Sequence, residues 1–170
     1  MNNILLYISL GLITSALLFI LALRILDSRN QLGIEGKLIW IDKGKATKPF
    51  FNPSYEVTGK PDLMYRIRDG VLAVEYKSRH GPIYRSDIVQ AKCAALAARS
   101  DGYPVIQILI KTSTTEEYFR LPRNEADLYG EIKTYVLIAR EAKSGAKMGA
   151  WPTINKCNGC AFNETCDMKV

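Results

Sequence analysis

The 170-residue chain has no charged side chain between Ile4 and Leu23, a single histidine, His80, and only four cysteines. It also has no internal repeat and no low-complexity run, so repeat proteins and compositionally biased, disordered proteins are excluded. One histidine excludes a metal site built from several imidazoles. The length remaining after the uncharged run is enough for one domain with a hydrophobic core.

The uncharged run at residues 4–23 is long enough to cross a bilayer, because twenty residues rise about 30 Å as an α-helix. A cleaved signal peptide would begin with basic residues and have a shorter apolar core, whereas the first three residues here are uncharged. Basic residues follow the run and none precedes it: Arg24, Arg29 and Lys37. The positive-inside rule therefore predicts a single-pass membrane protein whose C-terminal domain is cytoplasmic.

The rest of the chain alternates between strand and helix patterns. We expect strands within residues 36–44, 62–68, 70–78, 103–112 and 116–122. Helices are expected at residues 86–100, with Ser86 or Asp87 as the N-cap, and at residues 124–145. Residues 45–61 are broken by prolines and glycine and are predicted to be a loop. This order predicts an α/β fold with a mixed sheet flanked by helices.

The dipeptide Asp69-Gly70 between two strand-like runs is typical of a two-residue type I′ hairpin turn. A turn at these positions puts Asp62 opposite Lys77, with Glu75 as the diagonal neighbour of Asp62. Opposed residues share a face of the sheet, with Cβ atoms about 5 Å apart. The sequence therefore predicts two carboxylates and one amine on one patch of sheet, where the two acids could share one divalent metal.

The two faces of this hairpin differ in composition. One face is apolar and aromatic and is expected to form the core: Leu63, Tyr65, Ile67, Leu72, Val74 and Tyr76. The other carries the three charged residues together with Met64, Arg66, Arg68, Val71 and Ala73. Pattern alone leaves a solvated surface and a metal-dependent site both open for this second face. Gln90 favours the site, because it lies on an otherwise apolar helix and a buried amide needs partners.

Together these residues resemble the PD-(D/E)XK nuclease superfamily. The run Lys60-Pro61-Asp62 followed by Val74-Glu75-Tyr76-Lys77 is similar to its Asp…Glu-X-Lys signature. Residues 86–92 are similar to the helix that carries an extra glutamine in the RecB-type branch. The C-x2-C-x5-C tail resembles the end of the CRISPR-associated iron–sulfur exonucleases. The resemblance covers residues 36–166 and implies a restriction-endonuclease-like fold.

The resemblance also implies a role for each residue. Asp62 and Glu75 would ligate Mg²⁺ or Mn²⁺, which prefer carboxylate oxygen, and the backbone carbonyl of Tyr76 would be a further ligand. Lys77 would orient the attacking water or stabilise the pentavalent phosphate, and Gln90 would hold Lys77 or the water. The metal would supply Lewis acidity and a hydroxide-like nucleophile.

The sequence departs from the family pattern in two places. Many relatives have a histidine ligand upstream of the aspartate, whereas His80 follows Lys77. The family uses four cysteines, one of them well upstream, whereas this chain has none between residues 26 and 62. The only other cysteine is Cys93, whose apolar helix is typical of a buried, inert thiol.

The three tail cysteines, Cys157, Cys160 and Cys166, are expected to bind a metal centre, since disulfides are not expected in a reducing cytoplasm. An iron–sulfur cluster with a non-cysteine ligand and a zinc ion completed by Asp167 or water both fit three thiolates. A tail with three free thiols and no metal is the remaining option.

These features predict a membrane-anchored, metal-dependent DNA nuclease, an exonuclease that hydrolyses phosphodiester bonds of single strands or ends. The alternative is a catalytically weak nucleic-acid-binding or scaffold protein of the same fold at the membrane. The net charge of +6 permits an anionic partner. Candidate DNA contacts flank the site: Arg66, Arg68, Arg79, Arg85 and Lys92. The expected organisation is an anchor at residues 1–26, a nuclease-like domain at 27–156 and a metal-binding tail at 157–170 packed on the domain.

Overall fold

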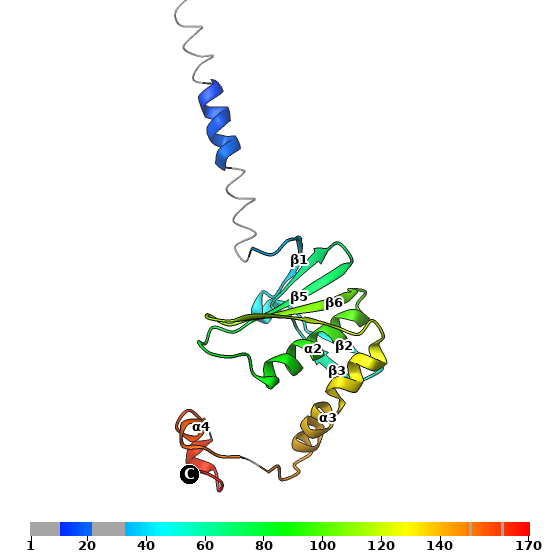
Figure 1. Ribbon diagram of the computed structural model, residues 1–170, viewed down its shortest axis with the longest axis vertical. Helices are drawn as coiled ribbons and strands as arrows, with labels where there is room; N and C mark the ends of the chain where they lie inside the picture. The colour runs from blue at the N-terminus through cyan, green and yellow to red at the C-terminus, as the bar shows by residue number, and fades with distance from the viewer. Residues whose placement is uncertain (1–10, 22–32, 150, 161) are drawn as a thin grey trace, which may run out of the picture. The chain divides into compact units, whose positions relative to one another are not determined.

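The computed structural model describes residues 11–21, 33–149, 151–160 and 162–170 (Figure 1). The chain divides into a first unit that ends at Ile132 and a second unit that begins at Lys133. Residues 11–21 are helical. The predicted membrane span at residues 4–23 therefore lies partly outside the described residues. Among the residues that are described, no helix has both the length and the apolar character needed to cross a membrane.

The first unit is built on a five-stranded sheet with the order β1-β4-β5-β6-β7. These strands are Lys37–Ile41, Leu63–Ile67, Gly70–Tyr76, Val105–Lys111 and Glu116–Arg120. Neighbouring strands are antiparallel except β5 and β6, which run parallel and are connected through helix α2, Arg85–Ser100. The predicted α/β fold with a mixed sheet flanked by helices is confirmed.

A second, two-stranded sheet replaces most of the predicted loop at residues 45–61. It pairs β2, Phe50–Asn52, with β3, Val57–Gly59, after a short 3-10 helix, η2, at Gly44–Ala46. The Asn52 side chain accepts hydrogen bonds from the backbone N–H groups of Ser54 and Tyr55 and so closes the turn. The loop prediction was wrong because strands of three residues are too short to show a period of two.

Helix α2 packs against the sheet on one side and against the β2–β3 hairpin on the other (Figure 1). Its buried side chains are mostly alanine: Ala91, Ala94, Ala95, Ala97 and Ala98. On the hairpin side, a Cβ atom placed on Gly59 would lie 2.4 Å from the Ala94 Cα atom. Small residues on both elements therefore permit a close approach of helix and hairpin.

The start of α2 is fixed differently from the prediction. Tyr84 is the N-cap, and Asp87, in the first turn, accepts a hydrogen bond from the Tyr84 backbone N–H at 2.8 Å. An acid in the first turn that reaches back to the N-cap N–H is one half of a capping box. The prediction of Ser86 or Asp87 as N-cap was wrong because Asp87 stabilises the same helix end from inside the helix.

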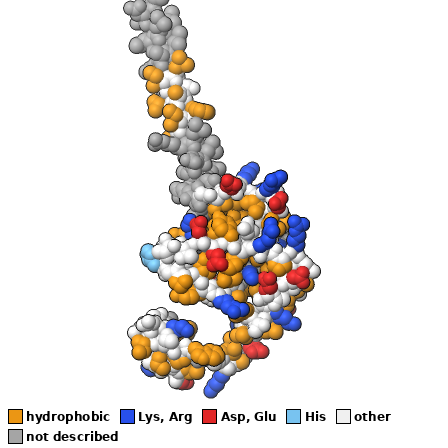
Figure 2. Space-filling view, viewed as in Figure 1, with side chains coloured by type: hydrophobic (Ala, Val, Ile, Leu, Met, Phe, Trp, Pro, Cys, Tyr) orange, Lys and Arg blue, Asp and Glu red, His pale blue; other side chains and the backbone are white. Residues whose placement is uncertain are grey.

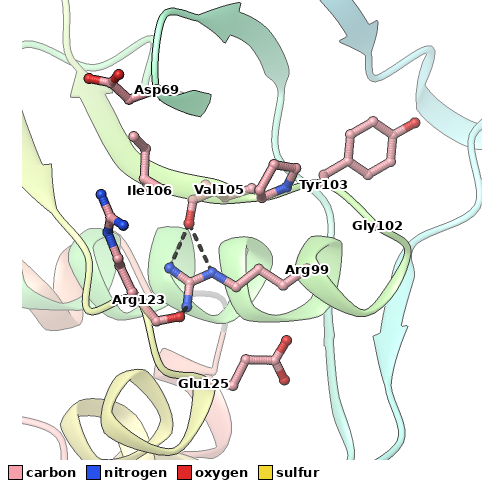
Figure 3. Close-up of a pocket in the computed structure, with 9 residues that line it drawn as sticks. Asp69, Arg99, Gly102, Tyr103, Val105, Ile106, Arg123 and Glu125 are labelled. Carbon is pink, nitrogen blue, oxygen red and sulfur yellow. Dashed lines mark hydrogen bonds between the residues drawn. The ribbon is translucent and has the colours of Figure 1, made fainter.

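The end of α2 is tied down by Arg99 (Figure 3). Its guanidinium donates to the carbonyls of Val105, at 2.6 and 2.8 Å, and of Pro122, at 2.7 Å. These bonds join α2 to the start of β6 and to the segment before helix α3, Glu125–Lys143. A cavity of about 440 Å³ lies at this junction, beside Asp69 and thus at the opposite end of β5 from Glu75. Neither Glu75 nor Asp62 lines this cavity, so we do not include it in the candidate site.

The β4–β5 turn is one residue earlier than predicted. Ile67 pairs with Gly70, so Arg68 and Asp69 are the turn residues. The type I′ geometry is wrong, since neither they nor Gly70 have a positive φ. Gly70 serves another purpose, because a Cβ atom there would lie 2.8 Å from the Pro104 carbonyl oxygen. Each residue of β4 therefore pairs with a β5 residue two positions earlier than predicted, and a shift of two residues keeps the two faces as predicted.

Both faces of the hairpin are buried along much of its length. The predicted apolar face forms a core cluster of Ile34, Tyr65, Leu72, Val74 and Leu109, although Tyr76 at its end is exposed. On the other face Met64, Val71 and Ala73 are also buried. The interpretation of this second face as a solvated surface is therefore excluded, and the end of β5 carries its charges into a covered region.

The second unit consists of the rest of α3, a short helix α4 at Ile154–Asn158 and a 3-10 helix η3 at Asn163–Thr165. The Thr153 hydroxyl accepts from the Lys156 N–H at 3.4 Å at the start of α4. The tail that was predicted to bind a metal is thus made of short helical turns. The domain limits expected from the sequence stay predictions.

We predict that Gly59→Ala destabilises the first unit by about 1–3 kcal/mol, since the new methyl group would overlap the α2 backbone. Thermal unfolding followed by circular dichroism would measure this as a lower Tm. The control is Gly130→Ala, where a Cβ atom meets nothing within 4 Å in helix α3; it should leave the Tm unchanged or raise it. Equal Tm values for the two variants would contradict the close packing.

Candidate active site

Glu75 lies near the end of β5, and its side chain is almost fully buried. Its Oε1 atom accepts hydrogen bonds from Lys77 Nζ at 2.8 Å and from Gln90 Nε2 at 2.6 Å. Gln90 Oε1 in turn accepts from Lys77 Nζ at 2.9 Å. Strand β5 and helix α2 thereby bring three of the four predicted catalytic residues into one closed hydrogen-bonded group.

The second carboxylate oxygen of Glu75, Oε2, is buried and has no hydrogen-bond partner among the residues that the structure describes. A buried acceptor without a partner bears the full cost of its lost hydration. Burial raises the pKa of Glu75 above its usual value; the Lys77 hydrogen bond opposes this rise, and the charge of Asp62 adds to it. The protein therefore holds a carboxylate whose charged form lacks a compensating cation on one side.

Asp62 is fixed by the strands on both sides of it. Its backbone N–H donates to the Val74 carbonyl at 3.0 Å, and its carbonyl accepts from the Asp42 N–H at 2.9 Å. Its side-chain Oδ2 accepts from the Tyr76 N–H at 2.6 Å. The β4–β5 pairing ends at Leu63 and Val74, and the Asp62 N–H bonds to the Val74 carbonyl rather than lying opposite Lys77. The predicted pairing of Asp62 with Lys77 was therefore wrong, and the Asp62 carboxylate instead binds the backbone N–H of Tyr76, the residue after Glu75.

These residues fit a hard divalent cation. The charge of Asp62 acts on the Glu75 carboxyl, and Glu75 Oε2 is buried with no donor among the described residues. Across the described part of the chain, no group of three or more His, Cys, Asp and Glu residues is placed to hold a metal. A cation at Asp62 and Glu75 would therefore complete its shell with neutral oxygen atoms, such as water and the predicted Tyr76 carbonyl, as Mg²⁺ commonly does.

The chain is similar to a known protein family. The sequence model of the PD-(D/E)XK nuclease superfamily matches residues 16–167. The chain belongs to this superfamily. A crystal structure of SSO0001 is similar over 92% of this chain and 72% of that chain, with 16% identity and a TM-score of 0.43. No curated protein matches. Membership of the superfamily suggests a metal-dependent nuclease that binds nucleic acid.

A second charged pair lies beside the hydrogen-bonded group of Glu75, Lys77 and Gln90. Arg79 forms an ion pair with the buried Asp87 and lies over the Tyr84 ring, 4.7 Å from its centroid. Burial raises the pKa of Asp87, but the hydrogen bonds from Arg79 and Tyr84 outweigh it and hold the pKa below its usual value. Sequence reasoning assigned Arg79 to DNA contact and Asp87 to the N-cap, and it missed the ion pair between them.

The basic residues proposed to contact DNA are partly engaged within the protein. Arg79 binds Asp87, and Lys92 Nζ lies 2.7 Å from Glu131 Oε2. On the face drawn in Figure 2, Lys and Arg side chains are interspersed with Asp and Glu side chains. His80, the histidine displaced from the family position, is exposed in the loop after β5. Arg79 and Lys92 would have to leave these acidic partners before they could contact a phosphate.

The cysteines differ in exposure. Cys157 is buried, Cys166 is half-buried and Cys160 is exposed, with its N–H donating to the Cys157 carbonyl at 3.1 Å. Among the described residues, these cysteines are not part of any group of three or more His, Cys, Asp and Glu side chains placed to hold a metal ion. Metal binding by the tail therefore stays a prediction. Burial raises the pKa of the Cys93 thiol, which agrees with an inert thiol on α2.

Glu75→Gln should change how stability depends on pH. The raised pKa of Glu75 stabilises the fold fully below the ordinary carboxyl pKa, and this contribution is lost as pH rises through the raised value. With chelator present, the Tm of Glu75→Gln relative to wild type should therefore increase between about pH 4 and pH 8. Added Mg²⁺ at neutral pH should raise the Tm of wild type by a few degrees and leave Glu75→Gln unchanged.

The matched control is Glu141→Gln, an exposed glutamate on α3, which should behave as wild type in both solutions. An equal rise in Tm with Mg²⁺ for wild type and Glu75→Gln would mean that the cation stabilises the protein elsewhere.

Proposed function

We propose that this chain is a metal-dependent deoxyribonuclease of the RecB-type branch that acts as an exonuclease on single strands or ends. Asp62, Glu75, Lys77 and Gln90 are the proposed active-site residues. The observation that carries the proposal is that the two carboxylate oxygens of Glu75 differ. Oε1 accepts hydrogen bonds from Lys77 and Gln90, and the buried Oε2 accepts none from the described residues.

The chain's own residues would divide the work among them. Asp62 and Glu75 would bind Mg²⁺ or Mn²⁺, which when bound supplies Lewis acidity and lowers the pKa of water. The Lys77 ammonium has three N–H donors, and Glu75 and Gln90 take two of them. The third is left to hold a water or a phosphate oxygen. Gln90 and the buried Glu75 would position the Lys77 ammonium beside the reacting phosphate.

The alternative is a catalytically weak nucleic-acid-binding or scaffold protein with the same fold. The departure that favours it is the lack of a histidine before Asp62, since the single histidine, His80, lies after Lys77. Such a protein would bind DNA without hydrolysing it. The same assay separates the two functions.

We expect the full-length chain to cut single-stranded DNA with Mn²⁺ or Mg²⁺ and to stop when chelator is added. Glu75→Ala and Lys77→Ala should each lower kcat/KM by more than about 100-fold, because each removes a group from the reacting centre. Gel analysis of end-labelled oligonucleotides measures this, with Lys143→Ala, an exposed lysine on α3, as the control. Full cleavage by Lys77→Ala would refute the assignment, and tight DNA binding without cleavage by wild type would favour the alternative.

We also propose that Cys157, Cys160 and Cys166 bind an iron–sulfur cluster or a zinc ion, with a structural role at the C-terminus. Anaerobically purified protein should then contain stoichiometric iron, with visible absorption, or zinc, without it. The triple variant with serine at these positions should lose the metal and keep the Lys77-dependent cleavage. A metal-free wild-type protein would contradict this proposal.

A membrane anchor at residues 4–23, with the nuclease domain in the cytoplasm, is proposed from the twenty uncharged residues there. The chain should remain in the membrane pellet after alkaline carbonate extraction, and a protease added outside intact cells should not cleave the domain. Release by carbonate would exclude the anchor.

A further inference from the structure

A hollow of about 440 Å³ opens beside the proposed metal-binding aspartate. It lies where the end of β1, the start of β4 and the end of β5 meet, and its lining residues are Ile41, Asp42, Asp62, Leu63 and Tyr76. The aliphatic residues and Tyr76 provide most of its surface. Asp62 belongs both to this hollow and to the pair of acids that would bind the cation.

Tyr76 separates the two sides of this strand end. Its neighbour Glu75 points to the α2 side of the sheet, so the Tyr76 side chain lies on the opposite face, because side chains alternate along a strand. The Tyr76 side chain is 47% exposed and that of Ile41 is 45% exposed. The exposed Tyr76 ring and Ile41 side chain therefore provide an apolar surface on which a planar ring could stack.

The charges of the hollow define what that partner is. Asp42 and Asp62 both line it, and Asp42 is paired with Lys60, with Oδ1 2.7 Å from Nζ. Because Lys60 offsets the charge of Asp42, the charge of Asp62 is what disfavours a bare phosphate group in this position. Carboxylate oxygens can instead accept hydrogen bonds from the N–H groups of a nucleobase. An aromatic ring, two aliphatic side chains and acceptor oxygens are the groups that stack on and hydrogen-bond to a base.

We propose that this hollow binds one unpaired nucleobase of the substrate strand, next to the phosphate that a cation at Asp62 and Glu75 would hold. The proposal rests on the proposed nuclease function and adds its substrate selectivity. A base in a duplex would have to leave its stack and its pairing partner to enter, which costs stacking and pairing energy. The hollow would thereby make the enzyme select single strands and frayed ends, and Tyr76 would be the specificity-determining residue.

The proposal is tested by a scan of single-stranded oligonucleotides with one abasic position each, using full-length protein in detergent. Cleavage by wild type should fall by at least about fivefold when one position, adjacent to the cut phosphate, lacks its base. Binding to Lys77→Ala with Mg²⁺, followed by fluorescence anisotropy, should weaken at that same position. The scan uses the native side chains, so its result does not depend on a variant that folds.

Tyr76→Ala should lower kcat/KM on intact single strands by about the same factor and should flatten the abasic scan, while Tyr76→Phe keeps both. The matched control is Tyr118→Ala, on β7. Tyr118 is 48% exposed and does not line the hollow. Its removal should change neither the rate nor the scan.

Two results separate failure of this subsite from failure of the nuclease. Lys77-dependent cleavage with a flat abasic scan would overturn the base-binding hollow and leave the hydrolase in place. Binding that depends on one base and on Tyr76, without any cleavage by wild type, would overturn the hydrolase and support the hollow.

Discussion

The site depends on one buried carboxylate with two different oxygen atoms. Glu75 Oε1 accepts hydrogen bonds from both Lys77 and Gln90, whereas the buried Oε2 accepts none from any described part of the chain. Desolvation alone would drive this group toward its neutral form, and the charge of Asp62 adds to that tendency. A divalent cation between the two acids would reverse the balance. The arrangement is costly without a cation and is favourable with one, which is the expected property of a metal-binding site.

The scaffold determines where Lys77 and Gln90 lie relative to that carboxylate. Lys77 follows β5 and is two residues from Glu75, so the strand alone brings them to one side. Gln90 depends on α2, whose start is held by Asp87 and whose end is held by Arg99. Between these two ends, buried alanines let the helix pack closely against the β2–β3 hairpin. Because both ends of the helix are fixed, Gln90 is held where its side chain can bond Glu75 on β5.

Much of this could be predicted from local sequence patterns. The longer strands and both long helices have clear periodicity. The alternation of residues 62–77 assigned the two faces of the hairpin correctly, although the predicted pairing was wrong by two residues. What failed depended on contacts between distant segments. Gly70 is required by the Pro104 carbonyl rather than by the turn, Gly59 is required by Ala94, and the β2–β3 hairpin is stabilised against α2. No local pattern contains such contacts. The Arg79–Asp87 pair was missed for the same reason.

The claim that Asp62 and Glu75 together bind one divalent cation is tested most directly by electron paramagnetic resonance of Mn²⁺ titrated into the full-length protein at neutral pH. The account predicts one bound Mn²⁺ per chain, seen as loss of the free-ion signal. It also predicts that this site disappears when either acid is replaced by its amide, Asp62→Asn or Glu75→Gln. Unchanged Mn²⁺ binding in both variants would contradict the account.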